Sequence, residues 1–270
     1  MKKGLHEIVI LLIMALTGLA SSCSDKPPLP KPDNPVLMVI FNHSANGEPV
    51  VFDQMVYENL AGNPYLINEI QYFISEFTLH YSDGTVIEPV IWDPFHYVDT
   101  DLEQTRHWII PDSLKQGTVD QVTFRLGICD ALNASFMFVN PPERDMFWPE
   151  YLGGGYHYMK LNGKWEPASG NYPNLPFDFH VGRGQIYENE EIVSFVDNSM
   201  TITPAGEAFS LSNGDTTTVV ITMQIENWFQ NPHVYNHDVW GGYIMNNQEA
   251  MQIAVENSHD VFIISREELP

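Results

Sequence analysis

Apolar and polar residues alternate along several stretches of the chain, with the period of two that is typical of a half-buried β-strand. One such stretch precedes residue 83, and another follows residue 214. Their apolar positions are Phe73, Phe77, Leu79 and Tyr81 in the first stretch, and Val219, Ile221, Met223 and Ile225 in the second. Both stretches are therefore predicted to be strands with one face buried. The run 36–41 is apolar at every position, which is typical of a central strand covered on both faces.

Four dipeptides mark the expected turns between strands. Asn-Gly occurs at 46–47, 162–163 and 213–214, and Asp-Gly occurs at 83–84. These dipeptides readily supply the positive φ angles of type I′ turns, which join neighbouring antiparallel strands. We therefore predict a β-hairpin at each of the four positions.

Helical spacing is concentrated near the C-terminal end, between Asn247 and Asn257. The apolar residues with this spacing are Ala250, Met251, Ala254 and Val255. Many short strands with so little helix predict an all-β fold, an antiparallel β-sandwich with one or two short helices near the C-terminus. The sequence shows no repeat of fixed period and no internal proline-rich linker, so residues 36–270 are expected to form one domain.

The first 35 residues do not follow this pattern. Two lysines precede an apolar run over 8–19, and small residues at 20–22 stand directly before Cys23. This order predicts a lipoprotein signal peptide over residues 1–22 with Cys23 as the acylated residue, because the run is shorter than the roughly 20 residues that span a bilayer. Plain secretion is the alternative, since Ala20 stands where such signals usually carry leucine. Residues 23–35 are rich in proline and predict an extended tether. We therefore expect a cell-envelope protein, lipid-anchored at the outer membrane on its periplasmic or surface face.

Charge and cysteine content narrow the range of partners. The formal net charge is −23 at pH 7, which disfavours nucleic acid and anionic lipid surfaces but leaves cations and neutral ligands open. Membrane contact is expected through the lipid anchor only. With Cys23 acylated, Cys129 has no partner, so no disulfide is expected. Cys129 follows an alternating run and is predicted to be a strand residue rather than a nucleophile.

The common catalytic signatures are missing from the sequence, which contains no Gly-x-Ser-x-Gly, no phosphate-binding loop and no His-Glu-x-x-His. The glycine run 153–155 leads into a strand-like pattern, so it is interpreted as a bend or a close backbone approach. We therefore do not expect an enzyme. Nine of the ten histidines lie beyond the leader, and imidazole and thioether ligands suit copper.

Several motifs resemble the MbnP-like copper-binding family. The most specific is Met-Phe-Trp-Pro at 146–149, which runs into Gly-Gly-Gly-Tyr-His-Tyr-Met at 153–159, followed by Phe-His-Val-Gly at 179–182. Further similar segments lie at 41–47, 57–63, 72–75, 96–101, 122–128 and 257–262. The resemblance covers residues 36–264, nearly all of the mature chain, and points to a Bacteroidetes-type lipoprotein member.

The resemblance implies a β-sandwich that binds copper for uptake, storage or trafficking. In well-known members a tryptophan is oxidised to kynurenine by a partner di-haem protein of the MbnH type, and the product joins histidines around copper(I). Its aromatic amine offers a lone pair, whereas the indole N–H only donates. Residues that match the family-like segments are the candidate metal ligands His43, His96, His157 and His180 and the candidate oxidised tryptophan Trp148.

Three departures from the family pattern bear on the site. Asn133-Ala134 stands where many members carry Asn-His, Glu150 replaces a second tryptophan, and cysteines common in those members are missing. A second function class therefore stays open, a non-enzymatic surface module that binds a glycan or a protein. The 12% aromatic content could supply its binding platform, although aromatic residues more often fill a β core.

Overall fold

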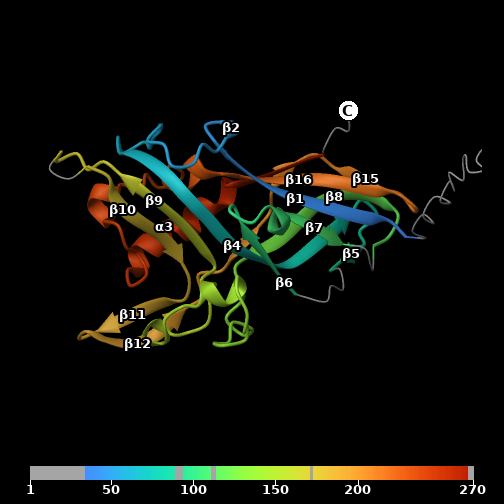
Figure 1. Ribbon diagram of the computed structural model, residues 1–270. Helices are drawn as coiled ribbons and strands as arrows, with labels where there is room; N and C mark the ends of the chain where they lie inside the picture. Colours follow the sequence, from blue (N-terminus) through green and yellow to red (C-terminus); the bar gives the residue numbers. More distant parts are fainter. Residues whose placement is uncertain (1–33, 89–93, 111–113, 171–172, 267–270) are drawn as a thin grey trace, which may run out of the picture. The chain divides into compact units, whose positions relative to one another are not determined.

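The computed structural model describes residues 34–88, 94–110, 114–170 and 173–266 (Figure 1). In these ranges the first β-sheet has the strand order β14-β17-β16-β1-β2, with β7 paired to β1. Its strands are β1 (Val36–Ala45), β2 (Glu48–Pro49), β7 (His107–Ile110), β14 (Ala205–Gly206), β16 (Thr216–Gln224) and β17 (Phe262–Arg266). The leader, Cys23 and most of the predicted tether lie outside the described residues.

The second sheet is built around one long strand, β4 (Pro64–Tyr81). The sheet order is β10-β9-β4-β8-β13, with β15 paired to β8 and with β3, β5 and β6 paired to β4. The other strands are β3 (Tyr57–Glu58), β5 (Val86–Ile87), β6 (Phe95–Asp99), β8 (Gly117–Leu126), β9 (Met159–Trp165), β10 (Leu175–Val181), β13 (Met200–Ile202) and β15 (Phe209–Leu211). A separate hairpin consists of β11 (Gly184–Glu188) and β12 (Glu191–Val196).

Helical segments in the described ranges are short. There the α-helices are α2 (His237–Trp240) and α3 (Gln248–Asn257), and the 3-10 helices are η1 (Glu103–Arg106), η2 (Glu143–Met146), η3 (Glu150–Leu152), η4 (Ile225–Phe229) and η5 (Ser258–Asp260). The Asn247 side chain caps α3 by accepting a hydrogen bond from the Ala250 backbone N–H, which explains why this helix begins where the sequence predicts. None of the described helices is long and apolar enough to cross a membrane.

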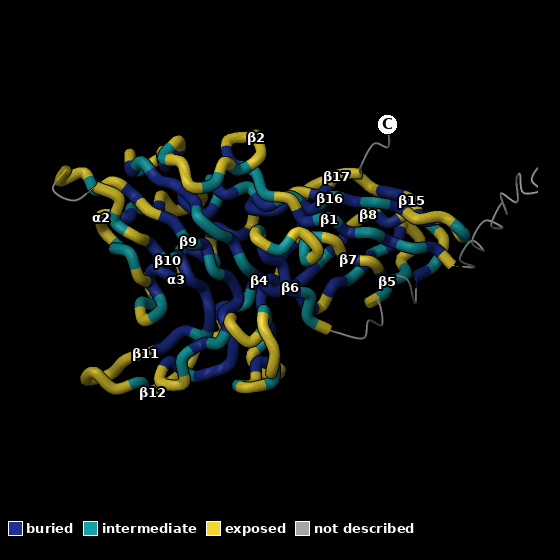
Figure 2. The backbone as a smooth tube through the Cα atoms, viewed as in Figure 1, coloured by how far each residue is buried: buried dark blue, intermediate teal, exposed yellow. Residues whose placement is uncertain are grey.

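Aromatic side chains join the two sheets face to face. Phe41 of β1 meets Tyr72 of β4 at 6.2 Å between ring centroids, and Phe262 of β17 meets Phe124 of β8 at 5.3 Å. These residues belong to one continuous buried cluster (Figure 2). Burying two apolar faces against each other is the main force that holds a β-sandwich together. The predicted β-sandwich is therefore confirmed.

The first half of β4, with β9 and β10, is covered by helical segments of the C-terminal region. Phe229 of η4 packs on Tyr65 of β4 and on Phe179 of β10, with ring centroids 5.3 Å apart in both pairs. Tyr235 packs on Phe179 at 5.1 Å. The two halves of this long strand therefore contact different partners within one core, since the second half faces the first sheet. This arrangement fixes β9 and β10, which carry part of the candidate site.

Several details of the predicted strand pattern are confirmed. β1 lies between β16 and β7, as expected for a central strand. Asn46 and Gly47 have φ angles of 55° and 82° and join β1 to β2, as a type I′ hairpin requires. Asp83 and Gly84 join β4 to β5, but the described left-handed residue in this turn is Gly84.

The sheets are also not wholly antiparallel, because β1 pairs with β16, and β14 with β17, in parallel.

Two predicted hairpins are wrong. Asn162 and Gly163 lie inside β9, where Gly163 pairs with both Ile67 and Phe177. A Cβ atom at Gly163 would lie 2.2 Å from the Leu66 carbonyl oxygen, so glycine is needed here for a close backbone approach and not for a turn. Residues 213–214 do form a turn, but it leads from β15 of the second sheet to β16 of the first.

Candidate metal centre

Trp148, His157 and His180 form a buried cluster where the 146–158 segment meets β10. The Trp148 and His157 ring centroids are 4.7 Å apart, and the His157 and His180 centroids are 5.0 Å apart, in edge-to-face contacts. Trp148 is fully buried, and the two histidines retain only 5% and 8% of their exposure. Two of the four predicted histidine ligands and the predicted tryptophan therefore come together in the folded chain.

Glycines shape the segment that carries Trp148 and His157. Gly153, Gly154 and Gly155 all have positive φ angles, which turn the chain back so that Trp148 donates its backbone N–H to the Gly155 carbonyl at 2.8 Å. The predicted bend at this glycine run is confirmed. Directly after β10, a Cβ atom at Gly182 would lie 2.6 Å from the indole ring, so glycine leaves the space that Trp148 fills.

Hydrogen bonds hold one nitrogen of each imidazole. His157 Nδ1 lies 2.9 Å from the Met146 carbonyl oxygen, which can only accept, so Nδ1 carries the proton. His180 Nε2 lies 2.7 Å from Asn162 Oδ1, and the Asn162 amide in turn donates to Glu69 at 3.1 Å. These contacts leave a lone pair on His157 Nε2 and on His180 Nδ1. Both atoms are buried and have no hydrogen-bond partner.

Burial keeps both imidazoles neutral. Desolvation, with smaller effects of His180 and Lys160, lowers the pKa of His157 well below its usual value. Desolvation and the Lys160 charge lower the pKa of His180 to about 3. A neutral imidazole whose other nitrogen is held by a carbonyl or amide oxygen is the form that binds metals, since the hydrogen bond fixes its orientation and tautomer.

Lys160 lies beside this cluster, paired with His180 across β9 and β10. Its ammonium group donates to the Asp145 carbonyl oxygen at 2.7 Å. Burial lowers the Lys160 pKa, while four carboxylates, on Glu69, Asp145, Asp99 and Asp178, oppose that shift. Because these carboxylates partly neutralise the ammonium, the site tolerates one more positive charge, and a monovalent ion meets less repulsion than a divalent one.

The other two predicted ligands lie elsewhere. His96 is stacked between Phe41 and Trp108, with ring centroids at 5.5 and 4.6 Å, and its Nε2 bonds the Thr105 carbonyl oxygen at 2.8 Å. His43 lies on β1 beside Tyr72. The described part of the chain contains no group of three or more His, Cys, Asp or Glu side chains placed to hold a metal ion. The cluster at His157 thus offers two imidazoles.

Three positions depart from the sequence-based interpretation. Asn162 was assigned to a turn, yet it orients His180. The sequence signal for this role is its position two residues after Lys160, which places both side chains on the same face of a strand. Cys129 lies beyond the end of β8 at Leu126, so its assignment to a strand is wrong. Burial raises the pKa of the Cys129 thiol, in agreement with an unreactive residue. His237, which the sequence does not single out, is fully buried and begins α2.

Comparisons with known proteins agree with the fold and the motifs. The solved structure of MbnP from Methylosinus trichosporium is similar to this chain with a TM-score of 0.55 and 11% sequence identity, covering 86% of this chain and 99% of that chain. At this identity the likeness shows the fold alone. The comparison with curated proteins gives no match. The sequence profile described as MbnP matches residues 34–250. Because this match spans most of its length, the chain belongs to the MbnP family.

Proposed function

We propose that this chain is an exported, non-enzymatic lipoprotein that binds one copper ion through His157 and His180. One observation carries the proposal: two buried, neutral imidazoles touch each other, and each has one nitrogen held by an oxygen and one without a partner. Buried polar atoms are almost always hydrogen-bonded. Two buried nitrogens without hydrogen-bond partners in one cluster are therefore suited to bind a metal ion. Copper is favoured by the family resemblance and by the affinity of imidazole for copper.

Trp148 is the proposed third member of the site. Its indole Nε1 donates to the Leu152 carbonyl oxygen at 3.2 Å, so the intact side chain offers no lone pair to a metal. Oxidation to kynurenine would supply an aromatic amine beside His157. Trp148 is fully buried, so we propose that a di-haem oxidase of the MbnH type withdraws four electrons from the ring at a distance and passes them to a peroxide. The indole C2–C3 bond breaks, oxygen from water or peroxide is added at both carbons, and hydrolysis releases C2 as formate. The proposed role of the protein is copper uptake, storage or trafficking in the cell envelope.

Metal content and mass of the protein purified from its own host test the proposal together. We expect about one copper per chain, by elemental analysis, and a peptide containing Trp148 that has lost carbon and gained oxygen. Copper with an unmodified Trp148 would support a site made by histidines alone. Protein that contains no copper, and takes up neither copper(I) nor copper(II) when these are added, would contradict the proposal.

The lipid anchor is proposed at Cys23, followed by the tether through residue 35. We expect a clickable fatty acid fed to the host to label the wild-type protein and to leave the Cys23→Ala variant unlabelled, because acylation requires the Cys23 thiol. Cys129→Ala is the matched control and should be labelled like wild type. Labelling that survives Cys23→Ala would show that the chain is not anchored at this residue.

A surface binding module for a glycan or protein remains the second candidate, favoured by apolar side chains exposed near the Trp148 segment. Phe136, Val139 and Tyr151 are 71%, 75% and 76% exposed, and Phe195 of β12 is 50% exposed. Figure 1 shows the β11–β12 hairpin beside the loops of this region. Exposed apolar residues that cluster often mark interaction sites. A protein free of copper that retains a glycan or protein partner would favour this function.

A further inference from the structure

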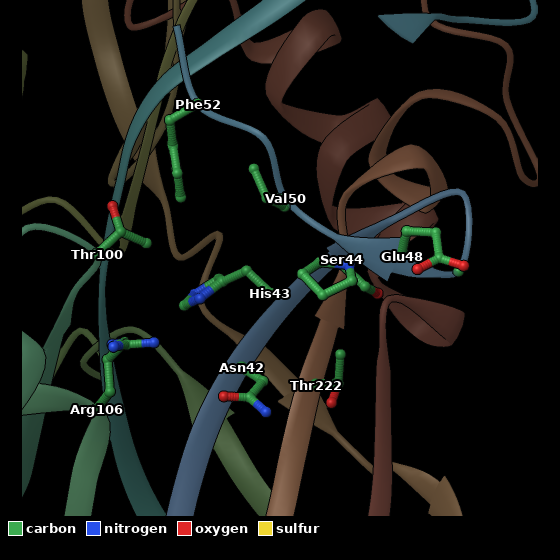
Figure 3. A pocket seen from close by; sticks show the side chains of 11 residues that line it. Asn42, His43, Ser44, Glu48, Val50, Phe52, Thr100, Arg106 and Thr222 are labelled. Carbon is green, nitrogen blue, oxygen red and sulfur yellow. The ribbon is translucent and has the colours of Figure 1, made fainter. Parts of the chain in front are cut away.

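A pocket of about 570 Å³ lies at the end of β1, beside the β1–β2 hairpin (Figure 3). Its volume is within the range of about 300–1,000 Å³ that is usual for small-molecule sites. The wall includes Val50 and Phe52, and polar side chains come from Thr100, Arg106 and His43. We propose that this pocket binds a small organic acid, with Arg106 holding its carboxylate group.

The proposal depends mainly on Arg106. This residue is the last of η1, and its guanidinium group points into the pocket toward His43 (Figure 3). Its Nε atom is buried without a hydrogen-bond partner, and within the described ranges Arg106 has no carboxylate within ion-pair distance. Arg106 as a whole is half-buried. A guanidinium partly withdrawn from water favours a carboxylate partner, because its planar set of donors matches a carboxylate in two parallel hydrogen bonds. Arg106 is thus placed to hold a carboxylate that enters the pocket.

Two more unpartnered polar atoms lie beside Arg106. His43 Nε2 and the Tyr72 hydroxyl are both buried without hydrogen-bond partners, and the two rings are 5.7 Å apart. Burial, with a smaller effect of the Arg106 charge, lowers the pKa of His43 to about 3. Burial raises the pKa of Tyr72, and the Arg106 charge opposes that rise. Of these groups His43 lines the pocket together with Arg106, and two buried polar atoms without partners in one pocket are unusual in a folded protein. A carboxylate would accept hydrogen bonds from such donors.

The charge at this pocket is opposite to that of the chain. The net charge is −23, yet Glu48, a lining residue, directs its carboxylate away from Arg106 (Figure 3). The nearby Asp99 carboxylate is held by Tyr97 at 2.7 Å and by Gln71 at 3.1 Å. Arg106 therefore keeps an uncompensated positive charge, which favours an anion and disfavours a metal cation at His43. Val50 and Phe52 suit the hydrocarbon part of an organic acid.

Calorimetric titration with succinate tests the proposal. Wild-type protein is expected to bind succinate, while Arg106→Gln should bind it at least 10-fold more weakly, because the charge and the paired donors are lost. Arg144→Gln is the matched control, since Arg144 is exposed and pairs only with Asp145 among the described residues; it should bind like wild type. Arg106→Lys, which keeps the charge but not the planar donors, should fall between them. Copper content should be unchanged in all variants.

Other probes fix the ligand class. Succinamide, which lacks the charge, should not bind. Equal binding of succinate to wild type and to a folded Arg106→Gln protein would overturn the proposal, and so would binding of inorganic phosphate without succinate. If Arg106→Gln fails to fold, the NMR signal of the Arg106 Nε–H in the wild-type protein decides the matter. We expect succinate to shift this signal, and an unshifted signal at saturating succinate would refute the assignment.

Discussion

Replacing His157 with alanine is expected to abolish tight copper binding, because this change removes one of the two imidazoles that the folded chain brings together. The wild-type protein should bind one copper(I) ion in competition with a chromophoric chelator. We expect His157→Ala and His180→Ala each to weaken that binding by at least ~100-fold, since loss of an orienting partner alone typically costs 10- to 100-fold. Stability to urea, measured in parallel, would separate loss of the site from loss of the fold.

Two further variants sharpen this prediction. His107→Ala is the matched control, because His107 is exposed on β7 and takes no part in the cluster; its copper affinity should equal that of wild type. Asn162→Ala removes the amide that holds His180 Nε2 and should weaken binding by about 10- to 100-fold. Full affinity in both His157→Ala and His180→Ala would show that copper, where it binds, uses other residues such as His43 or His96.

Local sequence patterns predicted the fold well in strands that bury one face, because the alternation of apolar and polar residues directly reflects that burial. β16 alternates buried and half-buried residues as its sequence indicates, and α3 begins at its predicted cap. Gly163 shows where local patterns fail. The Asn-Gly pair is a strong turn signal, but Phe177 and the Leu66 carbonyl lie against this glycine from both neighbouring strands. Close contacts between strands distant in sequence override a local turn preference.

The candidate site was predictable only in part. The resemblance named His157, His180 and Trp148, yet it also named His96, and it ranked His43 above the other three histidines. To distinguish His157 and His180 from the other two histidines, one must know the register of β9 and β10. This register places His180 diagonally from Asn162 on one face of the sheet. No local pattern encodes that register. For the same reason Arg106 carried no signal, because its unpaired state depends on the directions of Glu48 and Asp99.

Because several histidines are buried in the neutral form, we expect the protein to lose stability in acid. His237 is fully buried among aromatic rings, 4.5 Å from Phe177 and 5.1 Å from Tyr235 between centroids, and neither of its ring nitrogens has a hydrogen-bond partner. Desolvation lowers its pKa to about 3, against a smaller opposing effect of Asp238. The pKa of His180 is lowered to the same value. In the unfolded chain these histidines titrate near pH 6.5.

The sign of the effect follows from proton uptake. Below about pH 6.5 the unfolded state binds a proton at each of these histidines, whereas the folded state stays neutral down to a pH of about 3. Stability is therefore complete above pH 7 and falls as the pH drops through this window. Between pH 7 and pH 5 each such histidine should cost about 2 kcal/mol of unfolding free energy. The apoprotein is thus expected to be markedly less stable to urea at pH 5.

His237→Phe isolates one histidine from this effect. Phenylalanine keeps an aromatic ring against Phe177 and Tyr235 but cannot take up a proton, so the variant should lose about 2 kcal/mol less than wild type between pH 7 and pH 5. Urea unfolding at the two pH values measures the difference, and carboxylates that titrate in this range cancel because both proteins contain them. His107→Phe, at an exposed site, is the control and should follow wild type. An equal loss of stability in His237→Phe and wild type would show that His237 is protonated in the folded protein.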